Sequence, residues 1–258
     1  MDRNQFPINA GGYRIDILFH GFPGKSLTHG GLGWSTVVLL RGHGHVALID
    51  TGPFGYRKDL LQILNHHGLK PADITDLVLS HAHHDHMINY LMFSKARLLI
   101  GAVELNWAIN APWGVTPIPE LYVRELKQDP RLKTLEEGEE ALPGLTCHLG
   151  PGHTPGHLIF VLDDGERDII FLQDSVKTRA ELVSRDTDMT YDASVSAATV
   201  EKVWTLWRKK LGSIVVPGHD MPFMLEGDRL IQLGKRPAQL KAYFRDSLSD
   251  ITIINLEQ

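Results

Sequence analysis

The chain of 258 residues contains one cysteine, Cys147. A single thiol cannot form an internal disulfide, so the fold must depend on its core rather than on covalent bridges. Cys147 lies in an apolar stretch and is expected to be a small core residue rather than a nucleophile. The N-terminal residues also lack the charged and then apolar segment of a signal peptide. Both absences favour a cytoplasmic location.

Positive charge and long apolar runs are scarce as well. The chain has 26 Lys and Arg against 31 Asp and Glu, which gives a net charge of −5 and argues against a nucleic-acid-binding surface. No uninterrupted apolar stretch reaches the length of a membrane span. With 43% hydrophobic and 22% charged residues, the composition is that of a globular chain long enough for a sizeable core. We expect a single domain over residues 1–258 that acts on a small molecule and binds neither nucleic acid nor membrane.

Histidine is abundant, and four histidines and an aspartate lie between Ser80 and His86. The apolar run that ends at Leu79 predicts a buried strand from Ile74. The apolar residues from Met87 to Phe93 predict a buried helix after it. The cluster therefore lies at the carboxyl end of a strand, where sheets with helical crossovers place their ligand sites.

The spacing within the cluster indicates metal ligands. His81 and His83 are two residues apart, so in an extended segment they point to the same side and can share one metal. Asp85 and His86 lie past the turn and can reach a second metal. Imidazole and carboxylate are the ligands of zinc sites that lack cysteine. The alternative, a solvated histidine-rich loop, is disfavoured because further ligands follow other predicted strands.

Five separated motifs occur in a fixed order along the chain. They are Asp50-Thr51-Gly52, His81-x-His83-x-Asp85-His86, the Gly150–His157 run Gly-Pro-Gly-His-Thr-Pro-Gly-His, Asp174, and Gly218-His219-Asp220. This set resembles the signature of the metallo-β-lactamase-fold superfamily over about Ser35 to Met221, and its details are most similar to the N-acyl homoserine lactone lactonases. The resemblance implies an α/β fold, an αββα sandwich of two mixed β-sheets with helices outside.

The resemblance also implies a ligand set for two metals. One metal would be held by His81, His83 and His153, and the other by Asp85, His86 and His219. Asp174 would bridge the two. The implied cofactor is two Zn²⁺ per chain, and the same ligands also accept iron or manganese.

An internal duplication agrees with this fold. A predicted hairpin, an aspartate, a helix, a strand and a histidine follow one another twice. The first series is 35–41 with 46–50, Asp50, 58–67, 74–79 and His81; the second is 158–162 with 168–173, Asp174, 195–211, 213–216 and His219. Two half-sheets whose carboxyl ends meet across the metals are the expected result.

Such a site predicts hydrolysis. A bound metal lowers the pKa of water from 15.7 to about 7, so a bridging hydroxide could attack a lactone, ester or amide carbonyl. Asp85 is the candidate to shuttle a proton to the leaving group. A thioester or phosphodiester hydrolase and an iron-dependent oxidoreductase on the same ligands remain alternatives. A binding module without activity is disfavoured because all seven ligands are present.

Several residues near the motifs carry further expectations. Where the lactonases place a tyrosine three residues after the bridging aspartate, this chain has Lys177, which is either a donor to the substrate carbonyl or a surface lysine. His157, Asp50 and Asp220 are expected to orient ligands or backbone, and His84 to pack behind the site.

Three segments have no assigned chemistry. Four prolines and three aromatic residues between Trp107 and Arg131 predict a loop rather than a helix. It is either a lid insertion (107–131) or pocket wall over the metals, or else a dimer contact or a satellite core. The glycine-rich stretch from Phe22 to Trp34 is a candidate substrate loop. The apolar run Ile251 to Ile254 could pair at a sheet edge or contact a partner subunit, which leaves a homodimer open.

Overall fold

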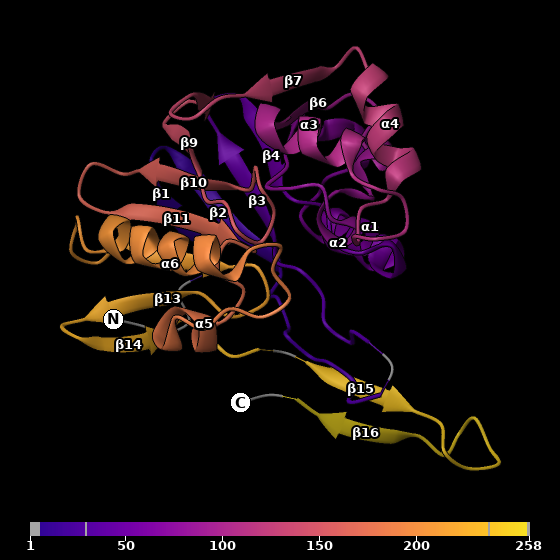
Figure 1. The fold of residues 1–258 in the computed structure, drawn as a ribbon. Helices are drawn as coiled ribbons and strands as arrows, with labels where there is room; N and C mark the ends of the chain where they lie inside the picture. Colours follow the sequence, from indigo (N-terminus) through magenta and orange to yellow (C-terminus); the bar gives the residue numbers. More distant parts are fainter. Residues whose placement is uncertain (1–5, 29, 237, 257–258) are drawn as a thin grey trace.

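The computed structural model describes residues 6–28, 30–236 and 238–256. Two seven-stranded sheets are stacked face to face and helices cover their outer faces (Figure 1). This arrangement confirms the predicted αββα sandwich of two mixed sheets.

The first sheet is built in chain order. Its strands are β1 (Ile8–Ala10), β2 (Tyr13–Phe19), β3 (Val37–Gly42), β4 (His45–Ile49), β5 (Asp76–Val78), β6 (Arg97–Gly101) and β7 (Leu132–Leu135). Strands β1 to β4 pair antiparallel and β4 to β7 pair parallel. Its helices are α1 (Arg57–His66), α2 (His84–Met87), α3 (Ala102–Asn110) and α4 (Glu120–Gln128), with 3-10 turns η1 (Phe54–Tyr56), η2 (Pro71–Asp73) and η3 (Tyr90–Met92).

The second sheet has the order β14-β13-β12-β11-β10-β9-β8. Its strands are β8 (Glu140–Leu142), β9 (Leu145–Leu149), β10 (Leu158–Asp163), β11 (Asp168–Gln173), β12 (Ile214–Pro217), β13 (Phe223–Glu226) and β14 (Arg229–Gln232). Its helices are α5 (Arg179–Ser184) and α6 (Ala193–Trp207). Strands β10 and β11 form a hairpin, and β12 pairs with β11 in parallel. In the first sheet, β3 and β4 form the corresponding hairpin, and β5 pairs with β4 in parallel. The predicted duplication is therefore visible in the pairing.

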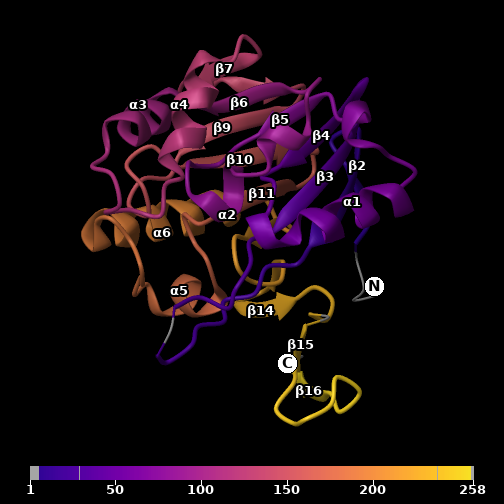
Figure 2. The same ribbon diagram turned by 90° about the vertical axis from the view of Figure 1, so that its right-hand side faces the viewer.

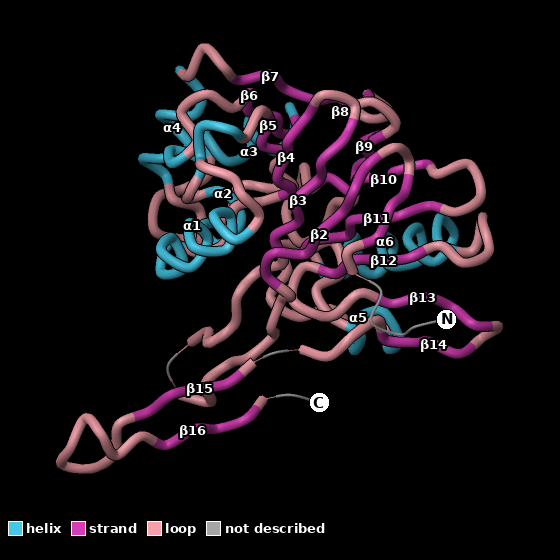
Figure 3. The backbone as a smooth tube through the Cα atoms, turned by 180° about the vertical axis from the view of Figure 1, so that it is seen from behind, coloured by secondary structure: helices cyan, strands magenta, loops and turns pink. Residues whose placement is uncertain are grey.

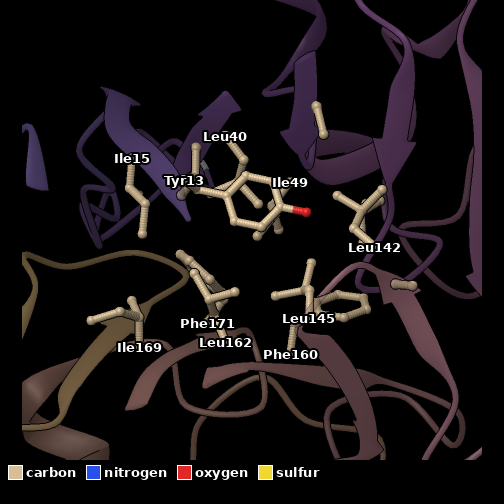
Figure 4. Packing of buried hydrophobic residues seen from close by; sticks show 14 of the residues in the cluster. Tyr13, Ile15, Leu40, Ile49, Leu142, Leu145, Phe160, Leu162, Ile169 and Phe171 are labelled. Carbon is tan, nitrogen blue, oxygen red and sulfur yellow. The ribbon is translucent and has the colours of Figure 1, made fainter. Parts of the chain in front are cut away.

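The core between the sheets follows from alternation along the strands. In Figure 4, Ile15, Leu40 and Ile49 of the first sheet face Phe160 and Phe171 of the second. Each of these side chains is fully buried. Cys147 belongs to the same cluster, so it is a core residue as expected.

Two outer cores attach the helices. The first lies between the first sheet and α1, α3 and α4. The second holds α6 against the other sheet through Val200, Val203 and Trp207, three or four residues apart on one helical face. Asp192 caps the amino end of α6 by accepting hydrogen bonds from the backbone N–H groups of Ser194 and Val195.

Two local predictions are wrong. The helix expected over Met87 to Phe93 begins earlier, as the single turn of α2, and continues only as η3. The segment 107–131 is not one loop, because it includes the end of α3 and the whole of α4. Its four prolines stand outside α4, which buries Val123 and Leu126; proline disrupts the interior of a helix but not its flanks.

The C-terminal residues form a separate two-stranded sheet of β15 (Gln239–Ala242) and β16 (Thr252–Asn255). Figure 3 shows this hairpin extending away from the two large sheets. The expected strand at Ile251 to Ile254 is thus present, but its partner is β15 rather than an edge of a large sheet. Within the described ranges, none of the helices is both long and apolar enough to cross a membrane.

Candidate metal centre

The site lies where the carboxyl ends of the two half-sheets meet. His81 to His86 follow β5, Asp174 follows β11, His219 follows β12, and His153 lies on the loop between β9 and β10. Backbone hydrogen bonds join the halves here. Leu158 donates to the carbonyl oxygen of Ser80 at 2.9 Å, and Thr36 donates to that of Gly218 at 2.6 Å. The ligand-bearing loops of both sheets are therefore held together by the backbone.

The structure brings all seven predicted ligand side chains together. Three groups have ligand atoms within 4.8 Å of one another: His81, His83 and His153; His81, His86 and Asp174; and Asp85, His86 and His219. Asp174 lies between them. Its carboxylate oxygens are 3.3 Å from the Nε2 atoms of His86, His153 and His219.

Buried polar atoms in the site have no hydrogen-bond partner among the described residues. They include His81 Nε2, His86 Nε2, His153 Nδ1 and Asp174 Oδ1. Leaving a buried polar group unpaired costs about 1–3 kcal/mol. Nitrogen and carboxylate oxygen atoms that converge in this way fit the donor set of zinc, so the residues present are suited to hold metal.

The charges differ between the two ends of the site. Burial holds the pKa of His81 and His153 well below the usual value and lowers that of His83 to about 4. Burial also opposes the charged form of His86 and His219, but the carboxylates of Asp174 and Asp85 outweigh it. They hold the pKa of His86 well above its usual range and raise that of His219 to about 10. The carboxylates thus make one end of the site strongly attractive to positive charge.

Asp50 orients residues in both halves. It is fully buried, and one of its oxygens lies 2.6 Å from His86 Nδ1 and accepts a hydrogen bond from Ser80 Oγ at 2.7 Å. Ser80 Oγ lies in turn 2.9 Å from His81 Nδ1. The side chain of Gln173, the residue before Asp174, also donates to Asp50 at 2.6 Å. Carboxylates bonded to metal-binding histidines fix the tautomer and direction of the ring.

The backbone around Asp174 is tightly constrained. Gln173 has a φ of 46°, a left-handed conformation that is costly for a residue with a side chain. Its carbonyl oxygen accepts a hydrogen bond from the backbone N–H of Gly218 at 2.9 Å. A Cβ atom at Gly218 would lie 2.0 Å from Asp174 Oδ1. Only glycine fits there, which explains the Gly218-His219 pair.

Glu104 is a site residue that the sequence analysis missed. It lies in the first turn of α3 and is fully buried. Its carboxylate accepts hydrogen bonds from Ala82 N at 2.8 Å, Thr154 Oγ1 at 2.7 Å and Gly156 N at 3.1 Å. Burial raises the pKa of this carboxyl to about 7. Glu104 thus ties the loop of His81 and His83 to the loop of His153, although no motif marks it.

The remaining predicted residues have different surroundings. Asp85 is partly exposed and lies 3.4 Å from His219 Nε2. Lys177 is mostly buried, and its Nζ lies 2.8 Å from Glu181 Oε1. His157 is fully buried with its ring 4.7 Å from that of His81. The expectation for His84 is wrong, because its side chain is exposed: as the first residue of α2 it turns away from the site.

Asp220 orients backbone, as expected. It accepts hydrogen bonds from the backbone N–H groups of Arg179 at 2.9 Å and Met221 at 2.8 Å. It also pairs with the buried guanidinium of Arg236. These contacts fix the chain immediately after His219.

Aromatic side chains border the site. The Trp107 ring lies 6.3 Å from that of His83 and 5.7 Å from that of Tyr191. Tyr191 is 65% exposed, and its backbone N–H donates to the carbonyl oxygen of His153 at 3.3 Å. Lys25, in the glycine-rich stretch, pairs with Asp188 on the loop that leads to Tyr191. The candidate ligand cluster therefore has an apolar wall on one side.

Comparisons with known proteins agree with this geometry. Residues 30–219 match the family model of the metallo-beta-lactamase superfamily. An N-acyl homoserine lactonase of Bacillus cereus is 24% identical over 164 residues, which are 63% of this chain and 62% of the relative. The chain therefore matches a little under two thirds of the length of that curated relative.

Solved structures share the fold. A probable metal-dependent hydrolase from Staphylococcus aureus superposes with a TM-score of 0.68 at 16% identity, over 87% of this chain and 98% of the other. AidC, a dizinc quorum-quenching lactonase with a bound N-hexanoyl homoserine product, gives a TM-score of 0.64 at 20% identity over 78% and 79%. The chain belongs to the metallo-β-lactamase superfamily.

The contacts of Glu104 generate a stability prediction. Glu104→Ala removes the acceptor of three buried donors, each of which costs about 1–3 kcal/mol when unpaired. We expect the free energy of unfolding, measured with urea, to fall by at least about 2 kcal/mol. Glu125→Ala is the control, because Glu125 is on the exposed side of α4. Equal stability of the two variants would show that Glu104 does not hold the two loops together.

Proposed function

We propose that this protein is a dinuclear-zinc hydrolase that opens a lactone or cleaves an ester or amide of a small molecule. The observation that carries the proposal is the convergence of seven ligand side chains from both half-sheets. The name of the Bacillus relative, a homoserine lactonase, supports a lactone as the first substrate to test. The apolar wall of Trp107 and Tyr191 suits a substrate with an apolar group beside its carbonyl.

The ligands divide into two sets. His81, His83 and His153 would hold one metal, Asp85, His86 and His219 the other, and Asp174 both. When bound, such a pair supplies hydroxide at neutral pH, because it lowers the pKa of water to about 7. Zinc is the expected metal, and iron or manganese could occupy the same ligands.

Asp85 is proposed to move the proton. Its side chain is 20% exposed, whereas Asp174 is buried, so Asp85 can face the leaving group. Burial opposes its charged form, yet His86 and His219 hold the pKa of Asp85 below its usual value. An ionised carboxylate at this position could take up the proton released when water attacks and pass it to the leaving group.

Lys177 is proposed to stabilise the substrate oxygen. The ammonium is mostly buried, and Glu181 holds it in place at 2.8 Å. An N–H donor directed at a carbonyl oxygen becomes stronger as negative charge develops there. The backbone also ties Lys177 to the site, because His219 N donates to its carbonyl oxygen at 2.9 Å.

Metal content tests the ligand assignment. Elemental analysis of protein purified without chelator should find close to two metal equivalents per chain. Asp174→Ala should lose metal and hydrolysis of a lactone panel together, since its carboxylate lies between both sets. Asp50→Ala should keep more metal, because Asp50 contacts the ligands rather than the metals. Metal near zero after supplementation, or greater loss from Asp50→Ala, would contradict the assignment.

Lys177→Ala tests the oxygen-stabilising role. The variant should keep its metals but lose about 10²–10³-fold in kcat, the usual effect of removing one such donor. Arg179→Ala is the matched control, since Arg179 is exposed two residues away. A change in KM alone would mean that Lys177 only binds substrate. Unchanged kinetics would leave Lys177 as the ion-pair partner of Glu181.

A further inference from the structure

The C-terminal hairpin is an arm, defined here as residues 238–256, that extends from the body of the molecule. Figures 1, 2 and 3 agree that it extends beyond both large sheets. Strand β15 pairs with β16 over four residue pairs, from Gln239 with Asn255 to Ala242 with Thr252. An isolated two-stranded hairpin is marginally stable in water. The arm therefore lacks the packing that stabilises the other strands.

Apolar side chains are exposed on both faces of the arm. Leu240 is opposite Ile254, and Lys241 is opposite Ile253. Because neighbouring residues of a strand point to opposite faces, Ile253 and Ile254 lie on different faces, and they are 54% and 43% exposed. Neither face is covered by the body. Six large apolar side chains of the arm are exposed: Tyr243, Phe244, Leu248, Ile251, Ile253 and Ile254.

The base of the arm is firmly attached. Arg236 is buried; its Nε donates to the carbonyl oxygen of Gly21 at 3.2 Å, and its guanidinium pairs with Asp220. Within the arm, Leu256 N donates to the carbonyl oxygen of Ala238 at 2.8 Å, which extends the pairing of its two strands toward this base. An exposed apolar arm with a fixed base is the form of an interaction surface rather than of a loose terminus.

The charge of the arm indicates its partner. It carries two basic residues, Lys241 and Arg245, and two acidic residues, Asp246 and Asp250. Arg245 and Asp250 pair with each other at 3.2 Å. A neutral arm offers no attraction to nucleic acid or to an anionic membrane, whereas two copies of it can meet without repulsion.

The apolar area also fits a symmetric pair. From their exposed fractions, the six side chains present on the order of 600 Å² per chain. Because these side chains lie on both faces, all of them are buried only if each arm lies between the arm and the body of its partner; two arms placed in this way would together bury about 1,200 Å², the lower end of the range for specific protein interfaces. A two-fold axis lets the same patch be used twice.

We propose that the arm is a dimerisation element that packs against a second copy of this chain. The six exposed side chains form the centre of the interface, and their burial supplies the packing that the isolated hairpin lacks. The proposal does not depend on the metal centre, because no ligand residue lies in the arm.

Light scattering after size-exclusion chromatography tests the proposal. The wild-type chain should elute as a particle of twice its mass of 28.9 kDa. Combining Phe244→Glu with Leu248→Glu places charge in the centre of the interface, so the dissociation constant should rise about 30-fold or more. Leu211→Glu is the matched control, because Leu211 is 96% exposed on the body; it should remain dimeric. Metal content should not change in either variant.

Spin labelling gives an independent measurement if the charged variant folds poorly. Cys147 is buried, so Leu248→Cys supplies the one accessible thiol in the sequence. Labels on two arms of a dimer should show dipolar coupling that disappears on dilution with unlabelled protein. The proposal would be overturned if the wild-type chain were a monomer at every concentration tested, or if the arm variants stayed dimeric. It would also be overturned if a monomeric wild-type chain sedimented with lipid vesicles.

Discussion

Burying a carboxylate is costly unless hydrogen bonds surround it, and Asp50 is fully buried where the two sheets meet. It is compensated by Ser80 and His86 of the first half and by Gln173 of the second. Removing it would leave these donors without an acceptor. Together with the backbone bonds and the core that join the halves, Asp50 therefore fixes His86 relative to Gln173 of the second half. The hydrogen bonds at the junction thus fix the direction of individual side chains, which apolar packing does not do because it lacks direction.

The rest of the site follows from the same constraint. Glu104 fixes the outer loops of His83 and His153 as Asp50 fixes the inner ones. Gly218 allows β12 to approach Asp174. The candidate ligands are thereby held in place by the protein, as a hydrolytic metal pair would require to act on a substrate without reorganisation. The aromatic wall of Trp107 and Tyr191 lies beside these residues.

The sequence predicted the strands and the candidate ligands better than the residues around them. The hairpins ending at Asp50 and Asp174 and the strands before His81 and His219 were predictable, because alternation and apolar runs mark strands and the polar motifs mark their ends. Helix α4 was not predictable, because the prolines of the segment 107–131 suggested a loop although they only flank the helix. Glu104 could not be found either: a single glutamate at a helix start looks like an ordinary first-turn acid. The exposure of the C-terminal arm could not be predicted either. It depends on whether other segments pack against the arm, and the residues of the arm alone do not indicate this.

The seven side chains are proposed to hold two metals with Asp174 between them. A crystal structure of the zinc-loaded protein, with diffraction measured on both sides of the zinc absorption edge, tests it most directly. We expect two anomalous peaks about 3.5–4 Å apart, one beside His81, His83 and His153 and one beside Asp85, His86 and His219. A single peak, or a second peak whose ligands lie elsewhere, would contradict it.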